Sequence, residues 1–155
     1  MTVDPLIARL PQEPPFRFLD AVVRHDPPHE AEAEKTFPPG DPIFAGHLPG
    51  EPIVPGVIVI EALAQLSGLV LAPRDLAAGG RLRGYLAGVS RLRFFRRVGP
   101  GETLRLHARL ERRLGTAALF AVTARVGEER VAEGAITVGG IDDAADPAAR
   151  HDPNP

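Results

Sequence analysis

The chain contains no cysteine among its 155 residues. Disulfide frameworks, thiolate metal sites, iron–sulfur clusters and cysteine nucleophiles are therefore excluded. An excess of charge of one sign is also lacking, because the formal net charge is only −2. A protein without a basic field is not expected to bind nucleic acid.

Long apolar runs are missing as well. The first fifteen residues lack the basic and then apolar regions of a secretory signal. The most apolar segment, residues 57–71, is too short to span a membrane and is interrupted by Glu61 and Gln65. We therefore expect a cytoplasmic protein without a membrane span.

Lysine is nearly absent, since Lys35 is the only one, whereas proline and glycine are abundant at 17 and 16 residues. The prolines cluster in the first third and the last few residues, which leaves the middle free to form regular structure. A hydrophobic content of 44% and a charged content of 25% fit one globular domain. We expect that domain at residues 1–141 and a disordered tail at residues 142–155, which hold no large apolar side chain.

The hydrophobic pattern predicts several strands and few other elements. Prolines interrupt the first fifteen residues, so only a short turn or helix fits there. Residues 30–37 alternate acidic and small side chains, which is typical of an edge strand or a solvated strand. Loops are expected at residues 38–55 and 73–81. Strands are predicted at residues 16–24, 30–37, 85–95, 104–111, 118–126 and 130–138.

Residues 56–72 are predicted to form one buried helix, because the segment is apolar on nearly every side. Pro55 and Gly56 provide a suitable helix entry. The last three strands alternate apolar and polar residues and are separated by turns at Gly115 and Gly127. Such an antiparallel sheet needs an apolar cover, and the helix can supply it. The predicted fold class is therefore α+β.

The candidate chemistry lies in residues 44–65, FAGHLPGEPIVPGVIVIEALAQ. His47 follows a glycine in a loop made rigid by proline, so its position can be fixed closely. Gly56 and Val57 begin the helix, where free amides and the helix dipole favour an oxyanion. Glu61 follows on the apolar helix, where a carboxyl buried without a partner keeps its proton and can act as an acid. Gln65 lies one turn further on the same face and can orient that carboxyl.

These parts suit proton abstraction next to a carbonyl, coupled to loss of a leaving group. Structural interpretations stay open at this point, because a single loop histidine often packs or caps a helix. A single glutamate on an apolar helix is often ion-paired or reaches the surface. A metal site is not expected, because no third and fourth ligands lie nearby at usable spacing.

The same segment resembles the signature of the FabZ-type 3-hydroxyacyl-[acyl-carrier-protein] dehydratases, a hotdog-fold family. That signature reads G-H-x-P-G-x-P-x-x-P-G-V and then E-A-x-A-Q, and it stands here at residues 46–57 and 61–65. The resemblance covers about residues 10–140. It also includes Leu10-Pro11, Pro15-Phe16, Asp20, Arg93-Phe94, Arg96 and Pro100-Gly101-Glu102.

The resemblance implies a hotdog fold, in which an antiparallel sheet wraps around one long central helix. It implies a homodimer, often assembled as a trimer of dimers, with active sites shared between subunits. His47 would take the C2 proton of a (3R)-3-hydroxyacyl thioester, and the partner's Glu61 would protonate the leaving hydroxyl. The Gly56 amide would polarise the thioester carbonyl, and the carbonyl of Ile53 would hold the His47 ring. No cofactor is needed for these proton transfers.

This chain also departs from the family pattern. Gln12, Glu13 and Pro14 replace the usual His-Arg-Tyr, Leu48 replaces a common Phe, and Arg97 replaces a common Pro. These departures leave open the acyl chain length and the pathway, whether primary fatty-acid elongation or a dedicated route. Two rival functions remain, a hotdog acyl-thioesterase and a non-catalytic acyl-binding partner subunit.

An acidic acyl carrier protein would be steered to a basic surface. Arg93, Arg96 and Arg97 form a basic run after the predicted helix and are candidate docking residues. A solvated strand face is the alternative interpretation of the same run.

Overall fold

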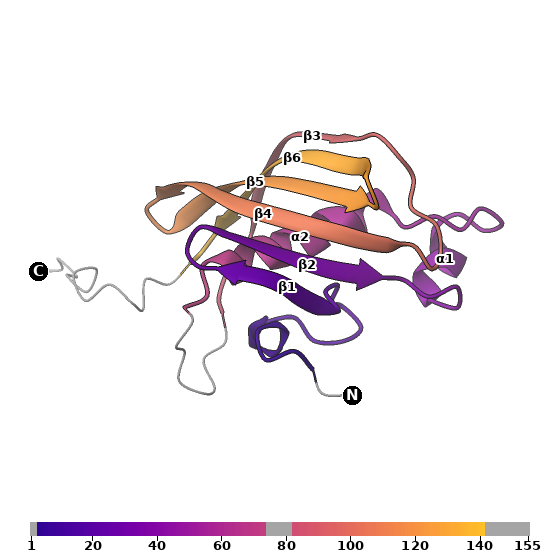
Figure 1. Cartoon of the computed structure of the whole chain (residues 1–155), viewed down its shortest axis with the longest axis horizontal. Helices are drawn as coiled ribbons and strands as arrows, with labels where there is room; N and C mark the ends of the chain where they lie inside the picture. Colours follow the sequence, from indigo (N-terminus) through magenta and orange to yellow (C-terminus); the bar gives the residue numbers. More distant parts are fainter. Residues whose placement is uncertain (1–2, 74–81, 142–155) are drawn as a thin grey trace, which may run out of the picture.

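The computed structural model describes residues 3–73 and 82–141. A single antiparallel sheet of six strands, in the order β1-β2-β4-β5-β6-β3, curves around the long helix α2 (Figure 1). The predicted tail at residues 142–155 and nearly all of the predicted loop at 73–81 lie outside the described residues. The elements are η1 (Ile7–Arg9), β1 (Ala21–Asp26), β2 (Glu30–Thr36), α1 (Pro42–His47), α2 (Gly56–Val70), β3 (Tyr85–Phe94), β4 (Thr103–Leu114), β5 (Ala117–Val126) and β6 (Glu129–Gly139).

Helix α2 forms the centre of the core and packs against β2, β3, β4, β5 and β6. Leu63, Leu66 and Leu69 are fully buried, as expected for a helix that is apolar on nearly every side. The helix ends at Val70 rather than at residue 72. The amides of Leu71 and Ala72 donate to carbonyls only three residues back, so the final turn is of the tighter 3-10 type rather than α-helical.

Strands β4 and β5 alternate as the sequence predicts. Leu104, Leu106 and Ala108 of β4 are fully buried, and Phe120 of β5 is buried beside them. The polar residues between them face outward from the sheet. The predicted α+β architecture is confirmed, and within the described residues no helix is long and apolar enough to cross a membrane.

Two predicted strands differ from the structure. Strand β1 begins at Ala21 rather than residue 16, because the Phe18 amide donates to the Gln65 side chain on α2 instead of joining a sheet ladder. The edge position predicted for residues 30–37 is wrong. Strand β2 lies between β1 and β4, with Ala31 and Ala33 fully buried on its inner face. Its outward glutamates pair with basic side chains of the neighbouring strands, which lets an acidic strand lie inside the sheet.

Helix α1 lies within the segment predicted to be a loop. Asp41 caps it by accepting a hydrogen bond from the Ile43 amide at 3.0 Å, and Pro42 occupies its first turn. An Asp-Pro pair is a recognised signal for the start of a helix, so the sequence carried the information. This short helix carries His47 at its last residue.

Strand β3 is one edge of the sheet and has an unpaired outer side within the described chain. It bends at a bulge, where a Cβ on Gly134 of β6 would lie 2.5 Å from the Leu92 Cα. Tyr85, Leu86, Val89 and Phe94 of this strand are between 41% and 66% exposed. The strand also contains Ser90, Arg91 and Arg93, but four large exposed apolar or aromatic side chains along an unpaired edge form a surface that proteins normally cover.

Candidate active site

Glu61 lies on α2 and accepts hydrogen bonds from two side-chain amides. Its Oε1 atom accepts from Gln65 Nε2 at 3.0 Å and from Gln12 Nε2 at 3.4 Å. The residue is only partly buried. Glu61 thus differs from the buried carboxyl without a partner that the sequence analysis considered. No hydrogen bond to Oε2 is found among the described residues, so this oxygen is the one available to a substrate.

The Gln65 side chain is buried and fully hydrogen-bonded. Its Nε2 donates both to Glu61 and to the Phe16 carbonyl at 3.0 Å, while its Oε1 accepts from the Phe18 amide at 2.9 Å. Exchanging the amide nitrogen and oxygen would place two acceptors together at Phe16, so this orientation follows from the network. Gln65 thereby fixes one side of the Glu61 carboxyl and also ties the N-terminal segment to α2.

His47 is exposed and lies at the end of α1. Its Nδ1 is 3.4 Å from the Ile53 carbonyl oxygen, the contact expected of a ring held in one tautomer. With Nδ1 donating to that carbonyl, Nε2 is left as the basic nitrogen. The intervening loop turns through Gly50, whose φ of +86° lies in the left-handed region that suits glycine.

The start of α2 presents free amides. The amides of Ile58 and Val59 both bond to the Pro55 carbonyl, at 3.0 and 3.3 Å. No acceptor for the Gly56 or Val57 amide is found among the described residues, as expected at a helix N-terminus. These two amides can therefore bind a developing oxyanion.

The predicted site residues fall into two separate groups within one chain. Glu61, Gln65 and the Gly56 amide are on α2, whereas His47 and Ile53 lie on α1 and the loop after it. No contact between His47 and Glu61 is found in the described part of the chain. The acid and the base predicted for one reaction are thus not joined by a contact within a single chain.

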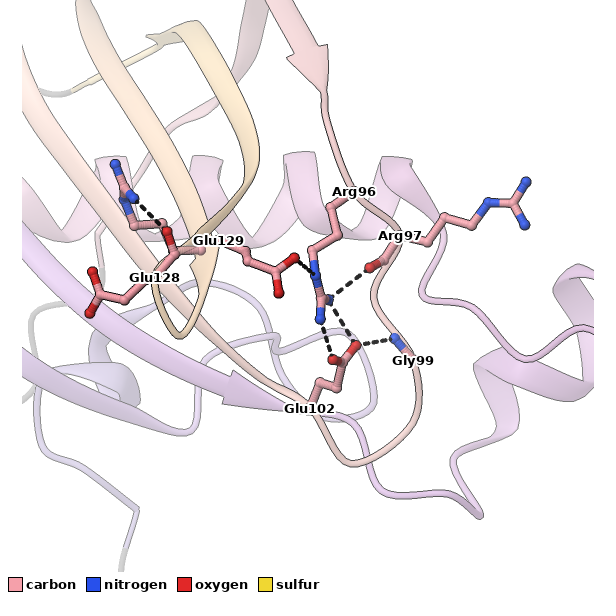
Figure 2. Close-up of polar contacts among 7 residues, drawn as sticks. Arg96, Arg97, Gly99, Glu102, Glu128 and Glu129 are labelled. Atoms are coloured by element: carbon pink, nitrogen blue, oxygen red, sulfur yellow. Dashed lines mark hydrogen bonds and ion pairs between the residues drawn. The ribbon is translucent and has the colours of Figure 1, made fainter.

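The predicted docking arginines have different surroundings. Arg96 donates to Glu102 through two nitrogens, at 2.6 and 3.0 Å, and to Glu129 at 2.8 Å (Figure 2). The Gly99 amide adds a bond to Glu102 at 2.7 Å. The hydrogen bonds from Arg96, and to a smaller extent the one from this amide, hold the pKa of Glu102 below its usual value. Arg96 is thus committed to shaping the turn between β3 and β4.

Arg97 and Arg93 are more accessible than Arg96. The Arg97 side chain points away from the Arg96 cluster (Figure 2). It is 75% exposed and contacts Glu51. Arg93 is exposed, and no ion pair of its own is found among the described residues. The two arginines therefore remain able to meet an acidic partner.

Sequence reasoning missed two features. One is Gln12, whose contact with Glu61 joins residues 49 positions apart in the chain. The other is a groove of about 760 Å³ on the outer face of the sheet, lined among others by Arg91, Arg93 and His107. This groove contains neither His47 nor Glu61, so it is separate from the candidate active site. In the part of the chain that the structure describes, no group of three or more acidic or histidine side chains is arranged to hold a metal ion.

Comparison with known proteins identifies relatives over most of the chain. The family model for FabA-like domains matches residues 10–135, a range that includes every candidate site residue. A 3-hydroxyacyl-[acyl-carrier-protein] dehydratase FabZ from Chloroflexus aggregans is 41% identical over 112 residues, 72% of this chain and 76% of the relative. The corresponding enzyme of Myxococcus xanthus is 34% identical over 148 residues, covering 96% and 97%.

A solved structure shows the same fold. The dehydratase heterocomplex ApeI:P from Xenorhabdus doucetiae matches with a TM-score of 0.70 at 18% identity. The match covers 90% of this chain and 92% of that one. The likeness supports the hotdog arrangement of sheet and helix.

Proposed function

This chain belongs to the FabA-like family and is a FabZ-type 3-hydroxyacyl-[acyl-carrier-protein] dehydratase of fatty-acid biosynthesis, and on that premise we propose that His47 and Glu61 carry its reaction. The observation that carries this proposal is the complementary state of the two side chains. His47 has Nδ1 at a carbonyl and Nε2 free, while Glu61 has Oε1 held by amides and Oε2 free. One side chain presents an unbonded ring nitrogen and the other an unbonded carboxyl oxygen, which are the atoms that a general base and a general acid use.

The reaction balances with these groups alone. His47 Nε2 takes the C2 proton of the (3R)-3-hydroxyacyl thioester, and the C2–H electron pair forms the C2–C3 double bond. The C3–O bond breaks, and Glu61 Oε2 delivers its proton to the leaving oxygen, which departs as water. The Gly56 amide, next to that of Val57, binds the thioester oxygen as negative charge develops there. The products are a trans-2-enoyl thioester and water, with no cofactor required.

We further propose that each active site is shared between two copies of the chain. The positions of His47 and Glu61 on different helices, without a contact between them among the described residues, fit this arrangement. So does the apolar edge of β3, which would be covered if a second β3 paired with it. The assembly is then a homodimer in which His47 of one protomer works with the partner's Glu61. Higher assembly into a trimer of dimers is a separate prediction.

The thioester would arrive on an acyl carrier protein in the cytoplasm. Arg93 and Arg97 are the candidate docking residues, because both are exposed. Arg96 is the weakest of the three candidates, since its guanidinium is already paired with Glu102 and Glu129. Exchanging Arg97, which lies outside β3, for glutamate should raise KM for the carrier-bound substrate while leaving kcat largely unchanged.

The first experiment supplies the protein with a short and a long (3R)-3-hydroxyacyl carrier protein and follows the product by mass. Loss of one water is expected, and both His47→Ala and Glu61→Ala should abolish it. His29→Ala and Glu128→Gln are matched controls, because both residues are exposed and are not candidate site residues. Activity of the two site variants at the level of these controls would contradict the proposed roles.

The same measurement separates the rival functions. Release of a free acid instead of water loss would indicate the acyl-thioesterase. No change in mass with either chain length would place the protein among non-catalytic acyl-binding subunits. The relative rates of the two substrates give the first measure of chain-length preference.

A further inference from the structure

Gln12 lies where this chain departs from the family's N-terminal motif, and it reaches the candidate acid. Its Nε2 is 3.4 Å from Glu61 Oε1, the same oxygen that Gln65 holds at 3.0 Å. Two amides from two different segments therefore converge on one carboxylate oxygen. Gln65 comes from the helix itself, and Gln12 comes from the segment between η1 and β1.

The backbone at Gln12 is anchored independently of its side chain. Arg17 donates through Nε and Nη2 to the Gln12 carbonyl, at 3.1 and 2.8 Å. Gln65 holds the same segment through the Phe16 carbonyl. Because main-chain contacts fix the segment, the Gln12 amide is not needed to hold it in place.

The other end of the Gln12 amide has no partner. Its Oε1 is buried from solvent without a hydrogen bond among the described residues. A buried acceptor without a donor costs stability, and an apolar side chain of similar length would remove that cost. This unpaired atom argues that the glutamine serves the carboxyl of Glu61 rather than the stability of the fold.

We propose that Gln12 is a positioning residue, whose amide holds Oε1 of Glu61 so that the protonated Oε2 faces the leaving hydroxyl. This inference rests on the proposed role of Glu61 as the acid. Gln65 alone leaves the carboxyl free to turn about its single hydrogen bond. A second donor from the opposite segment restricts that rotation and keeps one oxygen for the substrate. A hydrogen bond of 3.4 Å in the free enzyme can shorten when substrate is bound.

The test uses Gln12→Met, which keeps the side-chain length and removes the donor. With a (3R)-3-hydroxyacyl carrier protein, kcat should fall about tenfold with KM changed less than about twofold. The melting temperature should be unchanged or higher, because the unpaired buried oxygen is gone. Gln12→His restores an N–H donor and should recover most of kcat.

A second substrate separates positioning of the acid from a general effect on the site. The (3R)-3-fluoroacyl thioester loses fluoride after C2 deprotonation, with much less need for a proton from Glu61. Gln12→Met should therefore slow the hydroxy substrate but change the fluoro substrate less than about twofold. Glu61→Gln should show the same selective pattern with a larger effect.

Each outcome has a distinct meaning. An unchanged kcat in Gln12→Met would overturn the inference, as would an equal loss with both substrates or a loss of kcat that follows a lower melting temperature. Full activity of Glu61→Gln on the hydroxy substrate would instead overturn the proposed function of Glu61. A selective loss in Gln12→Met that Gln12→His reverses would support the assignment.

Discussion

At the scale of single residues, Gly56 combines a structural and a chemical requirement. The Phe94 ring lies against it, so that a Cβ on residue 56 would be 3.1 Å from Phe94 Cζ. The same residue provides one of the free amides at the start of α2. Space for the ring and access to the amide therefore both depend on the absence of a side chain at this position.

Gly56→Ala should lower activity because either Phe94 or the start of the helix must shift. We expect kcat to fall at least about tenfold, as for the loss of one oxyanion donor, with a small loss of stability. The measurement is kcat with the hydroxyacyl substrate together with the melting temperature.

Gly68→Ala is the matched control, because residue 68 lies in the same helix and nothing lies within 4 Å of a Cβ there. It should keep full activity and stabilise the protein by about 0.5–1 kcal/mol, since alanine favours a helix over glycine. Equal losses of activity in the two variants would indicate that any change in α2 impairs the enzyme.

At the scale of elements, the turn between β3 and β4 depends on one carboxylate. Glu102 receives two nitrogens of Arg96 and the Gly99 amide, and these contacts hold its pKa below the usual 4.5 (Figure 2). A carboxylate with a lower pKa in the folded state stabilises the protein above its unfolded pKa. That contribution is lost as the pH falls below about 4.5.

Glu102→Gln should therefore lower the melting temperature at pH 7, and the difference from the natural protein should shrink as the pH falls toward 3. Thermal unfolding between pH 3 and pH 7 measures the effect. Glu128→Gln is the control, because that side chain points away from the turn (Figure 2). It should change the melting temperature by no more than about a degree. A pH-independent difference for Glu102→Gln would show that geometry alone, without charge, explains the loss.

The same substitution on each edge strand of the sheet tests which edge takes part in assembly. Val89 on β3 is 42% exposed and Val23 on β1 is 48% exposed, yet only the β3 edge is proposed to pair with a second chain. Val89→Lys should give a folded monomer without activity, because a charge disfavours edge-to-edge pairing. Val23→Lys should leave both assembly and activity intact. Light scattering, circular dichroism and the dehydration assay distinguish these outcomes.

At the scale of the whole molecule, a shared active site makes a specific prediction about mixed assemblies. A dimer of one His47→Ala chain and one Glu61→Ala chain contains one doubly defective site and one intact site. Random mixing should therefore restore about a quarter of the natural activity, since half of the dimers are mixed and each has one working site. Mixing is achieved by co-expression or by refolding the two variants together.

Neither variant alone should be active, and the unmixed proteins combined immediately before the assay are the control. If each site lay within one chain, mixing would restore nothing. This outcome would leave only the exposed apolar side chains of β3 as a reason for pairing two β3 edges. The experiment thus tests the assembly through the chemistry rather than through its size.

The features of this protein that depend on local spacing can be read from the sequence alone. The apolar character of residues 56–70 specifies a buried helix, and the alternation from Leu104 to Ala108 specifies a strand with one buried face. His47, Gly56 and Glu61 could be identified because they lie within fifteen residues of one another. The Asp-Pro signal at the start of α1 is local as well, so α1 also lies within reach of sequence reasoning.

The features that depend on contacts between distant segments emerge only from the folded structure. The position of β2 inside the sheet follows from pairing with β4, whose partner residues are 67 to 79 positions away, so its acidic pattern is a misleading signal. Gln12 meets Glu61 across 49 residues, and no periodicity connects them. Residue spacing sets helix faces and strand faces, because both repeat over a few residues. Burial of the whole core determines which faces and segments then meet, and the local spacing of residues along the sequence does not encode it.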